Sequence, residues 1–187
     1  MALTEKGEMP ADIIIGADGA NSTVRKIINP DATIKFYSGA QVRLKASGIK
    51  EHAIKVYIKK PFFAWIIPES SQVVRVGVIG SNPHHELTVF LKEVCLEGEP
   101  IEKFGGVLPL GSCCTQKDNI ALVGDSACQV KPLSHGGIYY GLLCAEILAD
   151  CITRGRLAEY EKHWLGKFGR EIEVGLKMKR LYEELEG

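Results

Sequence analysis

The sequence predicts a mixed α/β fold in which two strand–turn–helix segments of a parallel layer flank an antiparallel sheet. Apolar runs that end at glycine lie at 13–16 and 120–124 of the 187-residue chain, as is typical of buried parallel strands. Between them, residues 33–80 form short alternating runs separated by turn residues, which is typical of antiparallel strands.

The first half of the chain divides into elements at these turn residues. Residues 1–10 are polar and hairpin-like, and 13–15 predict a strand, after which Asn21 or Ser22 is expected to cap a short helix. The predicted antiparallel strands are 33–48, 53–59, 63–68 and 72–80. On the first of these we expect one face to contain Ile34, Phe36, Val42 and Leu44.

The second half alternates helices and strands. Asn82-Pro83 predicts a helix start, because a cap residue and a proline precede apolar residues at helical spacing, namely Leu87, Phe90, Leu91 and Val94. Residues 101–110 are expected to be extended, 120–123 to rejoin the parallel layer and 137–153 to form a long buried helix. A last apolar stripe, which we interpret as core, contains Leu157, Tyr160, Trp164, Leu165 and Phe168.

The segment 119–141 contains the most informative motif of the chain. A strand breaks at Gly124-Asp125 and, after a turn at Pro132, a helix begins at Gly136-Gly137-Ile138. Such a helix start leaves backbone N–H groups uncovered at the positive end of the helix dipole, where a flat anionic ring or a phosphate can bind. Asp125, at a strand end, is placed to accept hydrogen bonds from sugar hydroxyls. An ordinary strand–turn–helix connection is the alternative interpretation.

Together with Asp18-Gly19 after the first strand, this motif resembles the two downstream fingerprints of the flavoprotein hydroxylase-like FAD fold. The closer resemblance is to the geranylgeranyl reductase family of archaeal type, whose second fingerprint matches Gln129-Val-Lys-Pro132 and residues 136–145 almost letter for letter. The chain departs from the family at Cys128, where the family has glycine, and at His135, which replaces the first of three glycines.

The resemblance implies a partial FAD-binding, Rossmann-like layer interleaved with an antiparallel substrate-binding sheet. FAD-domain segments are then expected at 1–30 and 111–155, the sheet with one helix at 31–110 and a C-terminal helical segment at 156–187. The cofactor-binding residues that it implies are Asp18, Gly19, Arg25, Gly124, Asp125, Pro132, Gly136, Gly137 and Ile138.

Residues 61–68 resemble the aromatic strand that lines the substrate cavity in this family, which implies substrate contacts by Phe63, Trp65 and Pro68. Alternation alone puts Phe63, Trp65 and Ile67 on one strand face, and such a face is more often core than ligand wall. The resemblance favours the ligand wall for Trp65.

The implied reaction is the FAD-dependent reduction of isolated carbon–carbon double bonds in a geranylgeranyl chain, as part of membrane lipid biosynthesis. Reduced FAD would deliver a hydride while a proton reaches the other alkene carbon. Cys128, His135, Tyr139 and a bound water all stay open as the proton donor, and NAD(P)H and a ferredoxin-type protein as the electron donor. Because no Gly-x-Gly-x-x-Gly strand–turn occurs, we expect an incomplete chain that is inactive by itself.

The composition of the chain limits the classes of binding partner and its location in the cell. Lys and Arg balance Asp and Glu at 23 each, so no net field favours nucleic acid. Without a signal peptide or an apolar run of membrane-spanning length, the sequence predicts a cytoplasmic protein, with peripheral contact to the membrane left open. For Lys177, Lys179 and Arg180, a solvated helix face is favoured over contacts with phospholipid head groups. The six cysteines lack Cys-x-x-Cys spacing, which favours reduced, buried thiols over disulfides or zinc ligands.

Two other functions stay open on the sequence. One is an FAD-dependent monooxygenase with the same fold, and the other is a non-catalytic module that binds a lipid or a protein partner. The residues Cys128 and His135, beside the expected flavin, favour the second of these.

Overall fold

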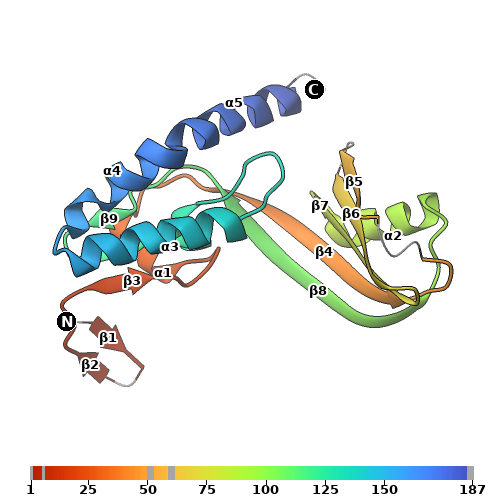
Figure 1. The fold of residues 1–187 in the computed structure, drawn as a ribbon, viewed down its shortest axis with the longest axis horizontal. Helices are drawn as coiled ribbons and strands as arrows, with labels where there is room; N and C mark the ends of the chain where they lie inside the picture. The colour runs from red at the N-terminus through yellow and green to blue at the C-terminus, as the bar shows by residue number, and fades with distance from the viewer. Residues whose placement is uncertain (1, 6, 50–52, 59–61, 185–187) are drawn as a thin grey trace. The chain divides into compact units, whose positions relative to one another are not determined.

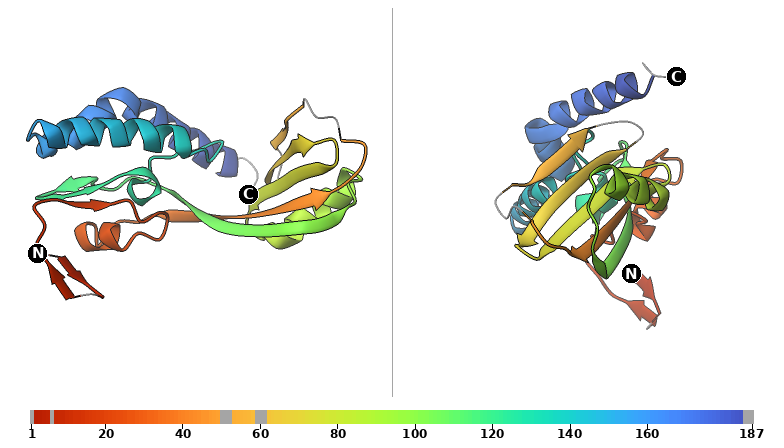
Figure 2. Two further views of the ribbon diagram at one scale, coloured as in Figure 1. Left: turned by 60° about the horizontal axis from the view of Figure 1, so that its bottom comes forward. Right: turned by 90° about the vertical axis from the view of Figure 1, so that its right-hand side faces the viewer.

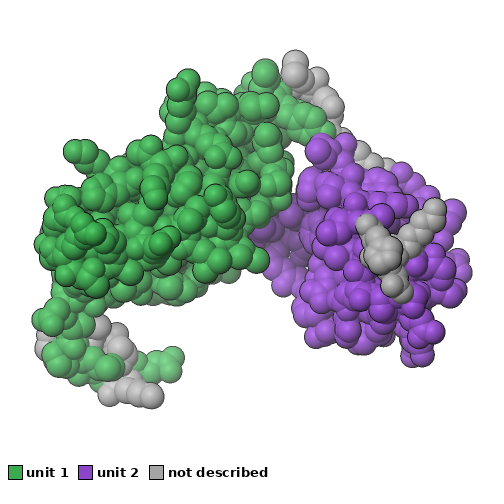
Figure 3. Space-filling view, viewed as in Figure 1, with its two compact units in different colours: residues 1–35, 109–187 green, residues 36–108 purple. Residues whose placement is uncertain are grey.

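The computed structural model of the chain describes residues 2–5, 7–49, 53–58 and 62–184. The chain forms two compact units, one from residues 1–35 and 109–187 and the other from residues 36–108 (Figure 3). The assignment of an FAD-binding and a substrate-binding role to such units stays a prediction.

The first unit contains a small sheet with strand order β3–β10–β9. Strand β10 (Ile120–Leu122) pairs parallel to β3 (Ile14–Gly16) and antiparallel to β9 (Gln116–Lys117). Ahead of this sheet, β1 (Ala2–Thr4) and β2 (Gly7–Met9) form an antiparallel hairpin. The strand and the hairpin that the sequence predicts at these positions are therefore present.

Helices cover both faces of this small sheet (Figure 2, left). On one face lie α3 (Ile138–Thr153), α4 (Tyr160–Trp164) and α5 (Arg170–Glu184), with the short helical turns η2 (Leu157–Glu159) and η3 (Leu165–Gly169) between them. Helix α3 buries one residue per turn at Tyr140, Cys144, Leu148 and Cys151. On the other face, α1 (Thr23–Ile28) packs Ile28 against Leu122 of β10.

The second unit is a five-stranded antiparallel sheet with strand order β5–β6–β7–β4–β8 (Figure 1). Its strands are β4 (Lys35–Lys45), β5 (Lys55–Ile58), β6 (Phe63–Ser70), β7 (Val73–Gly80) and β8 (Glu99–Leu110). Helix α2 (Pro83–Glu93) covers one face and buries Leu87 and Phe90 against it. The strand residues of this core are Ala40, Val42, Leu44, Ala64, Val74, Val76 and Val78.

The structure thus confirms the predicted mixed α/β fold with an antiparallel sheet. Phe36 alternates in register with Val42 and Leu44 on β4 but is 44% exposed, because the buried part of β4 begins at Ala40. One side-chain prediction is wrong: Leu165, expected in the core, is 44% exposed, because it opens a π-helical turn. The wider turn shifts the side chains out of the 3.6-residue register on which the prediction relied.

Candidate functional site

The loop after β3 folds back on the start of α1. Asp18 accepts hydrogen bonds from Ser22 Oγ at 2.6 Å and from the backbone N–H of Thr23 at 2.7 Å, while Ser22 Oγ accepts from the Arg25 N–H at 2.8 Å. Burial by itself would raise the pKa of Asp18, but the hydrogen bonds from Ser22, Val24 and Thr23 outweigh it and lower the pKa. Asp18 is therefore an ionised, solvent-facing group that caps a helix.

Arg25 links the two glycine motifs that the sequence analysis singled out. Its side chain is buried, with only 3% of the residue exposed, and Nη1 donates to the backbone oxygens of Asp125 at 3.2 Å and Ser126 at 3.0 Å. Nη2 donates to the backbone oxygen of Ala20. Sequence reasoning missed this clamp and instead assigned Arg25 to the dinucleotide, which stays a prediction.

Asp125 lies in a short 3₁₀ turn, η1 (Gly124–Ala127), directly after β10. The side chain is half-buried, and this burial raises the pKa of the carboxyl, while the nearby Arg25 guanidinium opposes the shift. A Cβ built on Gly137 would come within 2.7 Å of Asp125 Oδ1, so the carboxyl lies against the start of α3. The structure thereby brings together Asp125 and Gly137, two residues predicted to contact the cofactor.

The start of α3 is open. Gly137 is its N-cap and makes no side-chain cap hydrogen bond, Gly136 is exposed and Ile138 is 82% exposed. The backbone N–H groups of the first turn therefore face outward at the positive end of the helix dipole. Pro132, also predicted to contact the cofactor, is buried against Gly175 of α5.

Cys128 and His135 both adopt the left-handed backbone conformation, with φ of 56° and 57°. These are the two positions at which the chain departs from the glycines of the family fingerprint, and this conformation explains why glycine suits them. Both side chains are buried, with 3% of Cys128 and 5% of His135 exposed.

Gln129 is a site residue to which sequence reasoning gave no role. It is fully buried, and its amide accepts from the Gly124 N–H at 2.8 Å and donates to the Tyr160 hydroxyl at 2.9 Å. That hydroxyl donates to the backbone oxygen of Leu122 at 3.0 Å. The network fixes Gly124 to the end of β10. A signal was present, because Gln129 opens the matched Gln-Val-Lys-Pro run.

On the sheet of the second unit, Phe63 and Trp65 lie on the face opposite α2, since the residues that alternate with them, Ala64 and Ile66, pack in the core. The Trp65 indole covers Gly77 on the neighbouring strand, where a Cβ would come within 2.1 Å of the ring. Its Nε1 donates to Gln41 Oε1 at 3.0 Å. The three predicted substrate residues do not come together, because Pro68 pairs with Val74 on the core side.

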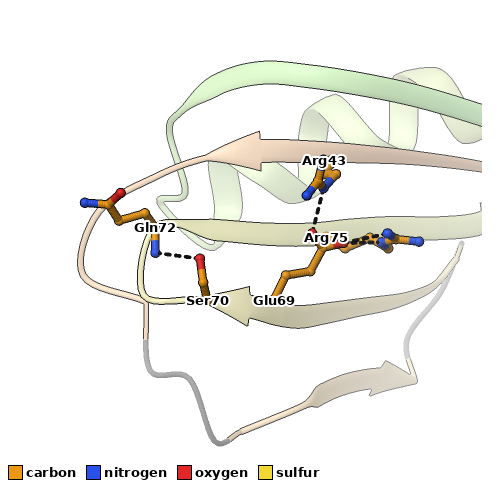
Figure 4. Close-up of polar contacts among 5 residues, drawn as sticks. All are labelled: Arg43, Glu69, Ser70, Gln72 and Arg75. Atoms are coloured by element: carbon orange, nitrogen blue, oxygen red, sulfur yellow. Dashed lines mark hydrogen bonds and ion pairs between the residues drawn. The ribbon is translucent and has the colours of Figure 1, made fainter.

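The same outer face carries two arginines that share one carboxylate (Figure 4). Arg43 and Arg75 are direct cross-strand partners on β4 and β7, and both donate to Glu69, at 2.6 Å from Arg43 Nε and 2.9 Å from Arg75 Nε. The hydrogen bonds from Arg43 and then Arg75 lower the pKa of Glu69. We call these three residues the arginine cluster. The cluster itself carries one net positive charge.

Comparison with known proteins gives relatives along nearly the whole chain. No protein-family model matches it. An uncharacterised protein of Methanocaldococcus jannaschii is 34% identical over 98% of this chain and 52% of its own length. Digeranylgeranylglycerophospholipid reductase 1 of Methanococcoides burtonii is 29% identical over 99% of this chain and 52% of its own length. The chain is homologous to both proteins.

The chain spans about half the length of these curated relatives. A further digeranylgeranylglycerophospholipid reductase, from Methanothrix thermoacetophila, is 29% identical over 95% of this chain and 52% of its own length. The homologues bearing this name are reductases from archaea, as the resemblance predicted.

Solved structures show the same fold at low sequence identity. A geranylgeranyl bacteriochlorophyll reductase-like protein of Thermoplasma acidophilum superposes with a TM-score of 0.75 at 18% identity, over 91% of this chain and 50% of that protein. A probable FAD-dependent monooxygenase of Pseudomonas aeruginosa gives 0.69 at 17% identity, over 91% of this chain and 56% of that protein. The chain therefore shares its fold with the parts of these two proteins that it covers.

Within the described residues, every helix is too short or too polar to span a bilayer.

Proposed function

We propose that this chain forms the flavin-facing and substrate-facing parts of an FAD-dependent reductase that saturates isoprenoid double bonds of a membrane phospholipid. The observation that carries the proposal is the open, glycine-rich start of α3 beside Asp125, in a chain homologous to digeranylgeranylglycerophospholipid reductases. When bound, FAD supplies the hydride that the double bond accepts.

The residues around the start of α3 fit the ring end of FAD. The N–H groups of Gly136, Gly137 and Ile138 would donate to the edge of the ring that becomes anionic on reduction, where the helix dipole adds stabilisation. The Asp125 carboxylate would accept hydrogen bonds from the hydroxyls of the chain that links ring and phosphates. Those bonds would favour its charged form and so offset the burial that now raises its pKa.

The remaining nucleotide residues would support this cradle. Gly124, with φ of 73°, lets the chain turn directly before Asp125, and Arg25 holds that turn against the loop of Asp18 and Gly19. Pro132 fixes the opposite side of the loop by its contact with α5. We propose Asp18 and Gly19 for the middle of the dinucleotide, because Asp18 is exposed at the end of β3.

The outer face of the second-unit sheet suits an isoprenoid phospholipid. Phe63 and Trp65 offer apolar surface, on which each buried methylene stabilises the complex by about 0.8 kcal/mol. The arginine cluster lies farther along the same strands, and its net positive charge suits a phosphate group. We therefore propose Phe63 and Trp65 for the hydrocarbon and Arg43 with Arg75 for the phosphate.

A chimera tests this function, because the match extends over nearly the whole chain. The matched half of the Methanococcoides burtonii reductase would be replaced by this chain, and flavin content and reduction of a geranylgeranyl phospholipid would be measured. We expect bound FAD and alkene reduction. NADPH-dependent oxygen consumption without alkene reduction would instead support a monooxygenase.

Two variants of the chimera separate the roles of the two sites. Asp125→Ala should weaken FAD binding by about one to two orders of magnitude, because hydrogen bonds to a charged group are lost, and excess FAD should restore turnover. Trp65→Ala should keep the flavin and weaken lipid binding. Asp12→Asn, which changes an exposed carboxylate ahead of β3, is the control and should change neither. Loss of flavin in the Trp65 variant, or full retention in the Asp125 variant, would contradict the assignment.

A further inference from the structure

Lys131 lies in the loop that leads from η1 to the start of α3. Its backbone N–H donates to the backbone oxygen of Gly136 at 3.0 Å, and its backbone oxygen accepts from the His135 N–H at 2.8 Å. The two hydrogen bonds close the loop 131–136 directly ahead of Gly137, the N-cap of α3. The backbone of Lys131 is therefore fixed beside the open helix start.

The ammonium of Lys131 lies over two aromatic rings of the first turn of α3. Its Nζ is 5.5 Å from the centre of the Tyr139 ring and 5.4 Å from that of the Tyr140 ring. Tyr139 is exposed, whereas Tyr140 is buried in the core around α3. A cation within about 6 Å of a ring centre is attracted by the negative face of the ring. The two rings therefore hold the charge of the half-buried lysine close to the helix start.

This position conflicts with the charge of the helix end. The N-terminus of a helix carries a partial positive charge, which favours anions and disfavours cations. At the start of α3 the helix dipole and the Lys131 ammonium have the same sign. Departures of this kind from a local rule are expected at functional sites. The two positive charges together favour negative charge in the site proposed above.

Arg25 and Lys131 use their charges differently. The Arg25 guanidinium donates hydrogen bonds to the backbone oxygens of Ala20, Asp125 and Ser126. The Lys131 ammonium contacts ring faces, which attract its charge without accepting a directed hydrogen bond. Arg25 thus holds the backbone together, while Lys131 adds positive charge beside the helix start.

We propose that the Lys131 ammonium is a fixed positive charge of the flavin site and stabilises FAD in its reduced, anionic form. The inference rests on the proposed function, and it assigns to Lys131 an effect on the reduction potential of the cofactor. The oxidised ring is neutral. A hydride from NAD(P)H, or two electrons from a ferredoxin-type protein with one proton from water, leaves the ring with one negative charge. The ammonium attracts that charge and so raises the reduction potential.

NMR of this chain by itself tests the position of the ammonium without any flavin. Protons above the face of an aromatic ring are shifted upfield, so the ε-methylene protons of Lys131 should resonate upfield of those of exposed lysines such as Lys162. Lys131→Arg removes the resonance and thereby assigns it, and Tyr139→Leu should reduce its shift. A Lys131 resonance at the position of the exposed lysines would overturn the inference.

The reduction potential of bound FAD tests the effect of the charge, in the chimera described above. Lys131→Met keeps the apolar stem of the side chain and removes the charge. We expect reduced FAD to lose about tenfold in affinity relative to oxidised FAD, which lowers the potential by about 30 mV for a two-electron couple. Lys131→Arg keeps a cation over the rings and should keep the potential. Lys162→Met, at an exposed position on α4, is the matched control and should also keep it.

The outcomes separate this inference from the proposed function. An unchanged potential in FAD-loaded Lys131→Met would overturn the role of Lys131 and leave the proposed function standing. Loss of oxidised FAD from the folded variant would also overturn that role, because the charge is assigned to the reduced form. Lys131→Gln, which keeps a polar group in the loop, repeats the measurement if the methionine variant does not fold. If the chimera bound no FAD with Lys131 intact, the proposed function would fail together with this inference.

Discussion

Single residues near the proposed flavin site show what the chain tolerates in place of glycine. Cys128 and His135 occupy left-handed backbone positions, which cost a residue with a Cβ about 1–2 kcal/mol each. Sequence comparison marked these residues as departures from a family pattern. The structure adds the physical reason, because only the folded backbone reveals the sign of φ.

His135 should make the stability of the first unit depend on pH. Burial lowers its pKa from 6.5 to about 4, with a further contribution from Lys179 and an opposing one from Glu183. The unfolded chain takes up the proton on this histidine near pH 6.5, and the folded chain only near pH 4. Above pH 6.5 the histidine is neutral in both states and therefore does not lower the free energy of unfolding. The free energy of unfolding should fall as the pH drops from 6.5 to 4, by about 3 kcal/mol in all.

Urea unfolding at several pH values between 4 and 7 measures this effect. His135→Asn should remove most of the slope, because asparagine tolerates the left-handed conformation and does not titrate. The same substitution at the exposed His85 serves as the control and should leave the slope as it is. A slope that His135→Asn leaves unchanged would mean that other groups cause it.

At the scale of elements, side chains that hydrogen-bond to backbone oxygens hold the turns and loops of the first unit in place. Arg25, from α1, holds the η1 turn, and Gln129 with Tyr160 holds the loop after η1 to β10. The Arg25 link joins the segment after β3 to the segment after β10, and the link through Gln129 and Tyr160 fixes the second of these segments to the end of β10. The proposed cofactor cradle therefore depends on residues that do not face it.

Arg25→Met should destabilise the first unit strongly. The apolar side chain fills much of the same space but removes the Arg25 donor from the backbone oxygens of Ala20, Asp125 and Ser126, of which that of Asp125 keeps the Cys128 N–H. A loss of about 2–5 kcal/mol in the free energy of unfolding is expected. Lys26→Met, at an exposed position on the same helix, should change it by less than about 0.5 kcal/mol. Equal effects of the two variants would rule out the clamp.

The elements themselves could be predicted, because strong local signals determine them. Ser22 caps α1, proline opens α2 after Asn82, and the apolar spacing of 137–153 gives α3. Contacts between distant segments could not be predicted. The Trp65 indole lies on Gly77, and the Arg25 guanidinium reaches residues 100 positions away, only because of the fold. The motif at 61–68 predicted substrate contacts for Pro68 and Trp65 alike, but the two residues lie on opposite faces of the strand.

At the scale of the whole molecule, each unit has a core of its own. The core of the first unit is built around Tyr140, Leu148 and Tyr160, and that of the second around Val76 and Phe90. Domains with separate cores commonly unfold as separate cooperative units. The sequence order agrees with this division, because the second unit is one continuous segment between the two segments of the first.

Native-state hydrogen exchange should therefore resolve two cooperative units. Leu148→Ala, which empties a buried site on α3, should speed exchange in α3 and α4 by the equivalent of about 3 kcal/mol and leave β6 and β7 unchanged. Val76→Ala, at a fully buried site on β7, should do the reverse with about 2 kcal/mol. Mass spectrometry of peptides from each unit measures the change in exchange rate that each substitution causes. If either substitution accelerated exchange equally in both units, the chain would unfold as one cooperative body, and the two cores would have to be treated as one.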